Sequence, residues 1–262
     1  MKLFLKDVAA YIEKISPVSL ACEWDNVGLI IGNSDKPIKR IVVCLDLTRE
    51  VLDFAIQKNA NLILSHHPFI FKGVKKINTK ESYGKMVEDI IKNDICVYAA
   101  HTNFDFAHNG LNDLLAKVID LHYSNSLYLG QSKDRIVGKI GEVIGDKTFG
   151  EFAEKVKEKL NVENVRIAGD VDKVVKRVAV FCGSFDENFL NLVTKRADVI
   201  VTGDLKHHVV LDIMQKGLCA IDAGHFGTEH IFVDYIKRLL TQNFDGIEVF
   251  ALSDEKDLFK YL

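Results

Sequence analysis

One pattern of strand, helix and strand occurs twice in this chain and restricts the folds open to it. The copies cover residues 39–65 and 176–202, and each opens with Lys-Arg and a short apolar run. In both copies 25 residues separate the arginine of the first run from the hydroxyl residue that closes the second. Sequence identity between the copies is low, so two generic α/β units would also produce the pattern. Strands that alternate with helices predict an α/β protein with largely parallel sheets.

Each copy is followed by a helix-like stretch and a further apolar run, at 95–101 and at 218–225. The 262 residues are enough for one large domain or two ordinary ones. We therefore predict two similar α/β units, a pseudo-repeat, over residues 1–125 and 126–262. A helix and a strand near the C-terminus could pack back on the first unit, and the sequence leaves open which sheet the last strand joins.

The spacing of apolar residues predicts the remaining elements. These are a helix at 5–15, a strand at 135–143, a helix at 148–160 with Thr148 as its N-cap, and a strand at 165–168.

Composition and charge exclude several classes of protein. The net charge is −3, which is not typical of a nucleic-acid-binding protein. No apolar run reaches 18 residues, so we expect no membrane span, and the first residues do not resemble a signal peptide. The five cysteines are odd in number and form no CxxC pair, which favours a reducing cytoplasm over a disulfide framework.

Two adjacent histidines directly follow a predicted buried strand. Residues 60–64 are mostly apolar and lead into Ser65-His66-His67-Pro68. Proline has no N–H and ends the strand, so the histidines lie at its carboxyl end, where open α/β sheets place ligand sites. Neutral imidazole is a common metal ligand. The alternative is a pair of polar histidines in an ordinary loop.

Two later strand ends share one spacing, a histidine followed four residues later by a carboxylate. These pairs are His101 with Asp105, and His225 with Glu229. Residues i and i+4 lie on one face of a helical turn, so each pair can reach one ion. We expect Thr228 to cap the helix that follows it, which would leave Glu229 in the first turn.

Four histidines and two carboxylates are more ligands than one tetrahedral ion needs. They suit two divalent ions that share a bridging carboxylate or water. A mixture of imidazole and carboxylate fits Zn, Fe, Mn, Co or Ni, and the order of affinities does not choose among them.

Other polar residues near these strand ends have two interpretations. His207 and His208 could assist the site or carry a proton, or they could be structural. Asp204 could orient a ligand histidine, and Asp46 could line the site. Residues 24–26 predict a tight turn, with a wall of the site as the alternative.

Five motifs in this order resemble those of the NIF-like family, whose members are often labelled GTP cyclohydrolase I type 2 homologues. They are Trp24-Asp25-Asn26-Val27-Gly28-Leu29, Ser65-His66-His67-Pro68, His101-Thr102-Asn103-Phe104-Asp105, Thr202-Gly203-Asp204 and Gly224-His225-Phe226-Gly227-Thr228-Glu229. The resemblance runs from near residue 20 to the C-terminus. It implies a dinuclear metal site between two α/β domains, and a homohexameric toroid built as a trimer of dimers.

Carried over motif by motif, the resemblance implies a set of metal ligands. They are His66, His67, Asp105, His225 and Glu229, with His101 as an additional histidine at the site. Longer relatives carry an inserted domain for which this chain is too short.

Two functions follow as hypotheses. The first is a metal-dependent hydrolase acting on a nucleotide, a purine ring or a small amide, in which Asp105 or Glu229 bridges the ions and His101 or His208 carries a proton. The second is a non-enzymatic hexameric toroid that binds single- or double-stranded DNA. Its support is a concentrated basic stretch after the histidines, formed by Lys72, Lys75, Lys76 and Lys80, which could equally be a solvated loop.

Overall fold

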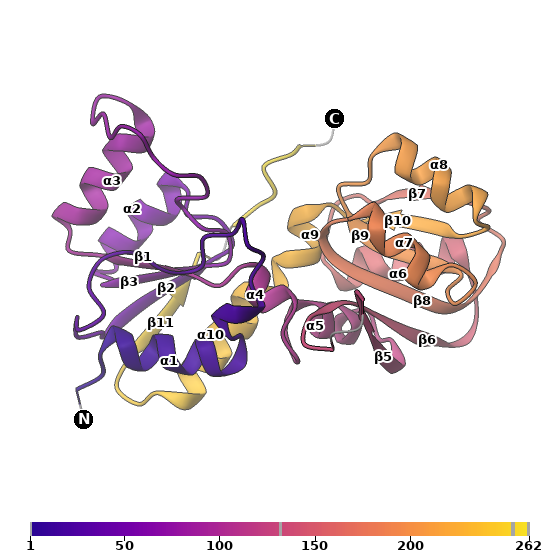
Figure 1. Cartoon of the computed structure of the whole chain (residues 1–262), viewed down its shortest axis with the longest axis horizontal. Coiled ribbons are helices and arrows are strands. Elements are labelled where there is room, and N and C mark those ends of the chain that lie inside the picture. Colours follow the sequence, from indigo (N-terminus) through magenta and orange to yellow (C-terminus); the bar gives the residue numbers. More distant parts are fainter. Residues whose placement is uncertain (1, 131–132, 253–254, 261–262) are drawn as a thin grey trace. The chain divides into compact units, whose positions relative to one another are not determined.

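The computed structural model describes residues 2–130, 133–252 and 255–260, and the chain falls into two compact units (Figure 1). The first unit contains Met1–Phe104 and Phe232–Glu255, and the second contains Asp105–Ile231 and Lys256–Leu262. These bounds differ from the predicted division at residues 125 and 126. The chain leaves the first unit within a short helix after Phe104 and returns to it at Phe232.

The first unit is built on a five-stranded sheet with the order β1-β4-β3-β2-β11. Its strands are β1 (Gly28–Ile31), β2 (Arg40–Cys44), β3 (Leu62–Ser65), β4 (Cys96–Ala99) and β11 (Glu248–Ala251). Its helical segments are α1 (Leu5–Ile15), η1 (Val18–Leu20), α2 (Arg49–Gln57), α3 (Ser82–Lys92), α4 (Thr102–Asp105) and α10 (Ile231–Asn243). All neighbouring pairs are parallel except β1 with β4. The last strand, which the sequence left unassigned, therefore joins this sheet beside β2.

Helices cover both faces of this sheet, with α2 and α3 on one side and α1 and α10 on the other (Figure 1). Val42, Ile63 and Val97 come from three neighbouring strands and belong to one buried cluster with Leu52 and Ile90 of α2 and α3. Burying each such side chain contributes about 1.5–3 kcal/mol. A sheet buried on both faces explains why its strands read as continuous apolar runs.

The second unit is built on a six-stranded sheet with the order β5-β6-β8-β9-β10-β7. Its strands are β5 (His122–Tyr128), β6 (Ile136–Thr148), β7 (Arg166–Ala168), β8 (Val174–Ser184), β9 (Val199–Gly203) and β10 (Cys219–Asp222). Its helical segments are α5 (Leu111–Val118), α6 (Phe149–Lys159), η2 (Glu187–Phe189), α7 (Leu190–Val193), α8 (His207–Gln215) and α9 (His225–Glu229). The three strands β8, β9 and β10 are parallel, and the others pair antiparallel. Helices α5 and α6 pack on one face, and α7 and α8 on the other.

The predicted pseudo-repeat is visible in the connections of the two sheets. Strands β2, β3 and β4 follow one another in parallel as β8, β9 and β10 do, with a helix between successive strands. The side chain of Asn61 accepts hydrogen bonds from the backbone N–H groups of Lys39 and Arg40, both at 3.1 Å. Asp198 accepts the matching pair in the second unit, at 3.0 and 2.8 Å. Asn61 and Asp198 thus bond in the same way to the Lys-Arg pair of each copy.

Several local predictions are confirmed. Helix α1 has the predicted bounds. Thr148 caps α6, because its hydroxyl accepts from the N–H of Glu151 at 3.3 Å while the Glu151 carboxylate accepts from the N–H of Thr148 at 2.8 Å. Among the described helices none has the length and apolar character needed to cross a membrane.

Candidate metal-binding site

Three histidines of the first unit converge where its parallel strands end. His66 and His67 follow β3, and His101 follows β4. The last residues of these strands, Ser65 and Ala99, are register partners, so both strands deliver their following residues to the same edge. One ring nitrogen from each histidine lies within 4.8 Å of the others. This spacing is suitable for ligands of one metal ion or of two neighbouring ions.

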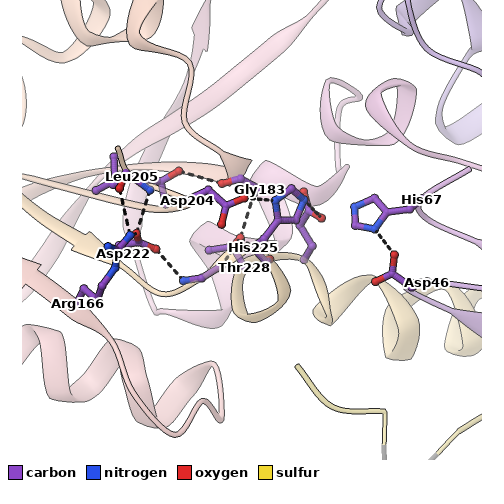
Figure 2. Close-up of polar contacts among 12 residues, drawn as sticks. Asp46, His67, Arg166, Gly183, Asp204, Leu205, Asp222, His225 and Thr228 are labelled. Carbon is purple, nitrogen blue, oxygen red and sulfur yellow. Dashed lines mark hydrogen bonds and ion pairs between the residues drawn. The ribbon is translucent and has the colours of Figure 1, made fainter. Parts of the chain in front are cut away.

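Hydrogen bonds at Nδ1 orient the two adjacent histidines. His66 is fully buried, and its Nδ1 donates to the backbone carbonyl of Ala100 at 2.8 Å. The Nδ1 of His67 bonds to the carboxylate of Asp46 at 2.9 Å, as Figure 2 shows. A neutral imidazole with its proton on Nδ1 carries its lone pair on Nε2, the arrangement found in metal-ligating histidines. Asp46, which the sequence suggested could line the site, therefore holds a histidine.

Asp25 holds the third histidine, His101, through a contact that the sequence did not predict. One carboxylate oxygen accepts from Nδ1 of His101 at 2.9 Å, and the other accepts from the N–H and hydroxyl of Thr102 at 3.1 and 2.6 Å. Burial raises the pKa of Asp25, but the hydrogen bonds from His101 and Thr102 outweigh it and lower this pKa to about 2. Asp25 is thus a carboxylate at neutral pH, and the predicted turn at 24–26 also serves the site.

Two exposed aromatic rings flank His101. Trp24 is 60% exposed and Phe71 is 45% exposed, although both are large and apolar. Their ring centroids lie 6.1 and 6.3 Å from that of His101, and 5.6 Å from each other. Exposed rings of this kind can stack against or cover a flat ligand. The alternative interpretation of Trp24, a wall of the site, agrees with this position.

The second unit supplies a histidine and a carboxylate from one short helix. His225 and Glu229 begin and end α9, and Nε2 of His225 lies 3.0 Å from the Glu229 carboxylate. The opposite ring nitrogen, Nδ1, bonds to Asp204 at 2.7 Å (Figure 2). The predicted spacing thus brings both side chains to one place, and the predicted role of Asp204 in orienting a histidine agrees with this contact.

The start of α9 differs from the prediction for Thr228. This residue does not cap a following helix with Glu229 in its first turn, because α9 already begins at His225. Gly224 has a φ of 77° and lets the chain enter α9 with only two residues between it and β10. The Thr228 hydroxyl instead donates within α9 and accepts from the N–H of Gly183 at 3.0 Å.

Asp105 belongs to the same unit as Glu229. It is 8% exposed, and its backbone carbonyl accepts from the side chain of Asn112 at 3.1 Å. Asn112 in turn accepts from the backbone N–H of Cys182 at 3.0 Å. Burial, followed by the charges of Asp105 and Glu229, raises the pKa of the Cys182 thiol well above its usual value. Both carboxylates therefore disfavour ionisation of the Cys182 thiol.

Among the residues predicted to carry a proton, His208 has an exposed position in the first turn of α8. Its Nε2 lies 3.7 Å from Glu187, and both side chains are mostly exposed. The catalytic role of His208 stays a prediction.

In the part of the chain that the structure describes, potential metal ligands follow the carboxyl ends of parallel strands in each unit. This defines a class of α/β proteins with histidine and carboxylate clusters at strand ends. Residues 3–257 match the family described as Duf34/NIF3 (NGG1p interacting factor 3). The chain belongs to this family.

Named relatives and solved structures resemble almost the whole chain. A GTP cyclohydrolase 1 type 2 homolog of Clostridium perfringens is 36% identical over 98% of this chain and 99% of its own length. One from Clostridium acetobutylicum is 38% identical, over 87% of this chain and 86% of its own. A hypothetical protein of Staphylococcus aureus has a TM-score of 0.92 at 32% identity, covering 100% of both chains. A protein of Bacillus cereus related to NIF3 has a TM-score of 0.91 at 28% identity, with the same coverage.

Proposed function

We propose that the chain binds two divalent metal ions and is a metal-dependent hydrolase. The proposed ligands are His66, His67, Asp105, His225 and Glu229, with His101 in or beside the first coordination shell. One observation carries the proposal: Nδ1 of all four histidines is bound to a carboxylate or a carbonyl oxygen. In metal-ligating histidines, such a partner orients the ring through the nitrogen that does not bind the metal. Polar loop histidines would not need this shared arrangement.

The donor set fits zinc-type ions. Glu229 is 2% exposed and Asp105 is 8% exposed, so both carboxylates are withdrawn from water. Buried carboxylates are costly unless they are paired or bind a metal. When bound, two ions would lower the pKa of a shared water and polarise a substrate oxygen. The metal could be Zn, Fe, Mn, Co or Ni, since imidazole and carboxylate ligands do not choose among them.

The chain's own residues would orient the ligands and move the proton. Asp46, Asp204 and Asp25 each hold one imidazole in place. Where His101 lies beside the first coordination shell, its Nε2 would take up a proton while Asp25 holds the ring through Nδ1. Asp105 or Glu229 would bridge the ions.

The proposed substrate is nucleotide-like or an amide. The exposed rings of Trp24 and Phe71 beside His101 would suit the flat ring of a nucleobase. The relatives' name, GTP cyclohydrolase 1 type 2 homolog, agrees with a purine substrate.

Metal analysis of protein purified without chelators tests the metal site first. We expect two ions per chain, and a loss of at least one ion in both His67→Ala and Glu229→Ala. His122→Ala is the matched control, because His122 lies exposed on β5 and should leave the metal content unchanged. Circular dichroism should show that all three variants remain folded. Full metal content in both ligand variants would contradict the proposal.

A screen for turnover then tests the hydrolase. Protein loaded with each candidate metal would be given GTP, other nucleotides and small amides. We expect turnover that disappears on chelation and returns with metal. Metal-loaded protein that turns over none of these compounds would contradict the hydrolase while leaving the metal site intact.

The second candidate is a non-enzymatic homohexamer, a trimer of dimers, that binds single- or double-stranded DNA. Lys72, Lys75, Lys76 and Lys80 are all exposed on the segment that follows the histidines. Such lysines could attract phosphates despite the negative net charge. A monomer mass at micromolar concentration would contradict the ring. DNA retention that falls steeply with salt, and falls further in Lys75→Glu, would favour this candidate.

A further inference from the structure

A cavity of about 270 Å³ lies in the second unit between helix α8 and the strands β10 and β7. Five of its lining residues are apolar: Ile167, Ala168, Leu205, Val210 and Ala220. Cavities of about 150 Å³ can hold benzene, and pockets for drug-sized molecules begin at about 300 Å³. The volume therefore suits a molecule somewhat larger than a single ring. The proposed metal ligands are not among the residues that line it.

Asp222, at the polar end of the cavity, has both carboxylate oxygens occupied. It is 5% exposed. One oxygen accepts from the backbone N–H of Leu205 at 2.9 Å and pairs with Arg166, and the other accepts from the N–H of Gly224 at 3.0 Å (Figure 2). These contacts satisfy and neutralise the carboxylate. Asp222 therefore serves as a rigid support for Arg166 and offers little to a cationic ligand.

Arg166 supplies hydrogen-bond donors at the mouth of the cavity. Its side chain is 68% exposed, and its Nη2 donates to Asp222 and, at 3.1 Å, to the carbonyl of Leu205. Within the described residues, these bonds involve Nη2 alone. A guanidinium has five N–H groups in a planar fork, so Nε and Nη1 retain donors for a ligand. His207 also lines the cavity and is exposed at the start of α8.

We propose that this cavity binds a small organic carboxylate. The apolar tail enters between α8 and the β10–β7 edge, and the carboxylate accepts hydrogen bonds from Arg166 and His207. A planar carboxylate matches the geometry of one guanidinium, whereas a phosphate would call for more cationic groups than a largely apolar cavity offers. The proposal does not depend on the metal site or on hydrolysis.

Fluorine NMR on the full chain tests this with 4-fluorophenylacetate as the probe. We expect saturable binding with a dissociation constant on the order of 1 mM, typical of a small ligand with one anchoring group. The neutral amide of the same shape, 4-fluorophenylacetamide, should bind at least about tenfold more weakly, the loss of about one charge-assisted hydrogen bond. Inorganic phosphate at equal concentration should not displace the acid.

Two variants locate the binding. Arg166→Gln should abolish it, whereas Arg196→Gln should not, although Arg196 also donates to a backbone carbonyl in the same unit. Because Arg166→Gln leaves buried Asp222 without its cationic partner, Val210→Phe provides a second variant that fills the cavity and changes no charge. Thermal melts would confirm that the variants are folded.

The proposal is overturned by any of three results. These are equal affinity for the acid and the amide, binding that persists in folded Val210→Phe, and displacement of the acid by an equal concentration of phosphate.

Discussion

Gly183 provides a sensitive test of the proposed role of Glu229. A Cβ atom added at Gly183 would lie 2.2 Å from a carboxylate oxygen of Glu229 and 3.5 Å from Nε2 of His225. Ordinary van der Waals contact begins at 3.4 Å, so in Gly183→Ala the carboxylate must move by about 1.2 Å. Metal–oxygen distances tolerate only about 0.2 Å. We therefore expect metal affinity to fall at least about 10- to 100-fold, or about 1.4–2.7 kcal/mol.

The substitution also strains the backbone, and a second glycine separates the two effects. Gly183 has a φ of 61°, where a side chain costs about 1–2 kcal/mol of folding free energy. Gly145 has a φ of 85° but would meet no atom within 4 Å, so Gly145→Ala carries the strain without the collision.

Zinc titration against a chelating indicator measures the affinity, and thermal unfolding measures the stability. Both variants should lose stability to a similar extent, but only Gly183→Ala should lose metal affinity. Equal zinc affinity in the two variants would refute the assignment of Glu229 as a ligand.

Three further predictions concern other residues. Asp204→Asn should weaken zinc binding about 10- to 100-fold, because it removes the charge that holds Nδ1 of His225; unchanged affinity in the same titration would argue against that role. Trp24→Ala should leave the metal content unchanged and weaken the binding of GTP by about 0.5–1.5 kcal/mol, measured by calorimetry; equal affinity would exclude stacking. Hydrogen bonds from Arg49 and Lys85 lower the pKa of Asp89 in the folded protein. Its carboxylate therefore stabilises the fold at a pH above the unfolded pKa of about 3.9. This stabilisation is lost as the pH falls through the lower pKa of the folded state. Asp89→Asn should therefore melt below the wild type at pH 7, and this difference in melting temperature should shrink as the pH falls below about 3.9; a constant difference would contradict the stabilising role of the Asp89 carboxylate.

Local patterns in the sequence were enough to predict much of the fold. Helix α1, the cap at Thr148 and the repeated strand–helix–strand connections all depend on residues that are close together in the chain. The bounds of the units were harder to predict, because β11 joins β2 through a pairing of Glu248 with Arg40. Nothing in the local spacing of apolar residues encodes a partner so distant.

In the candidate site too, contacts between residues close in the chain could be predicted, whereas a contact between distant residues could not. The spacing of His225 and Glu229 predicted their contact, since one helical turn brings them together. Asp25 bonds to His101 across 76 positions, and its place in an Asp-Asn turn predicted a tight turn or a wall of the site but not this contact. The role expected for Thr228 was wrong because Gly224, in a conformation that glycine permits, starts the helix four residues earlier than assumed.

The division of the chain also affects the order in which the protein can complete its folding during synthesis. The sheet of the second unit uses only residues between His122 and Asp222, so every strand that it needs is made in one continuous stretch. The sheet of the first unit lacks its partner for β2 until Glu248–Ala251 has been translated. The edge of β2 therefore stays open through the synthesis of about 200 residues, a period in which unpaired strands are prone to misassociation. The unit that leaves the ribosome first is the last one able to finish its sheet.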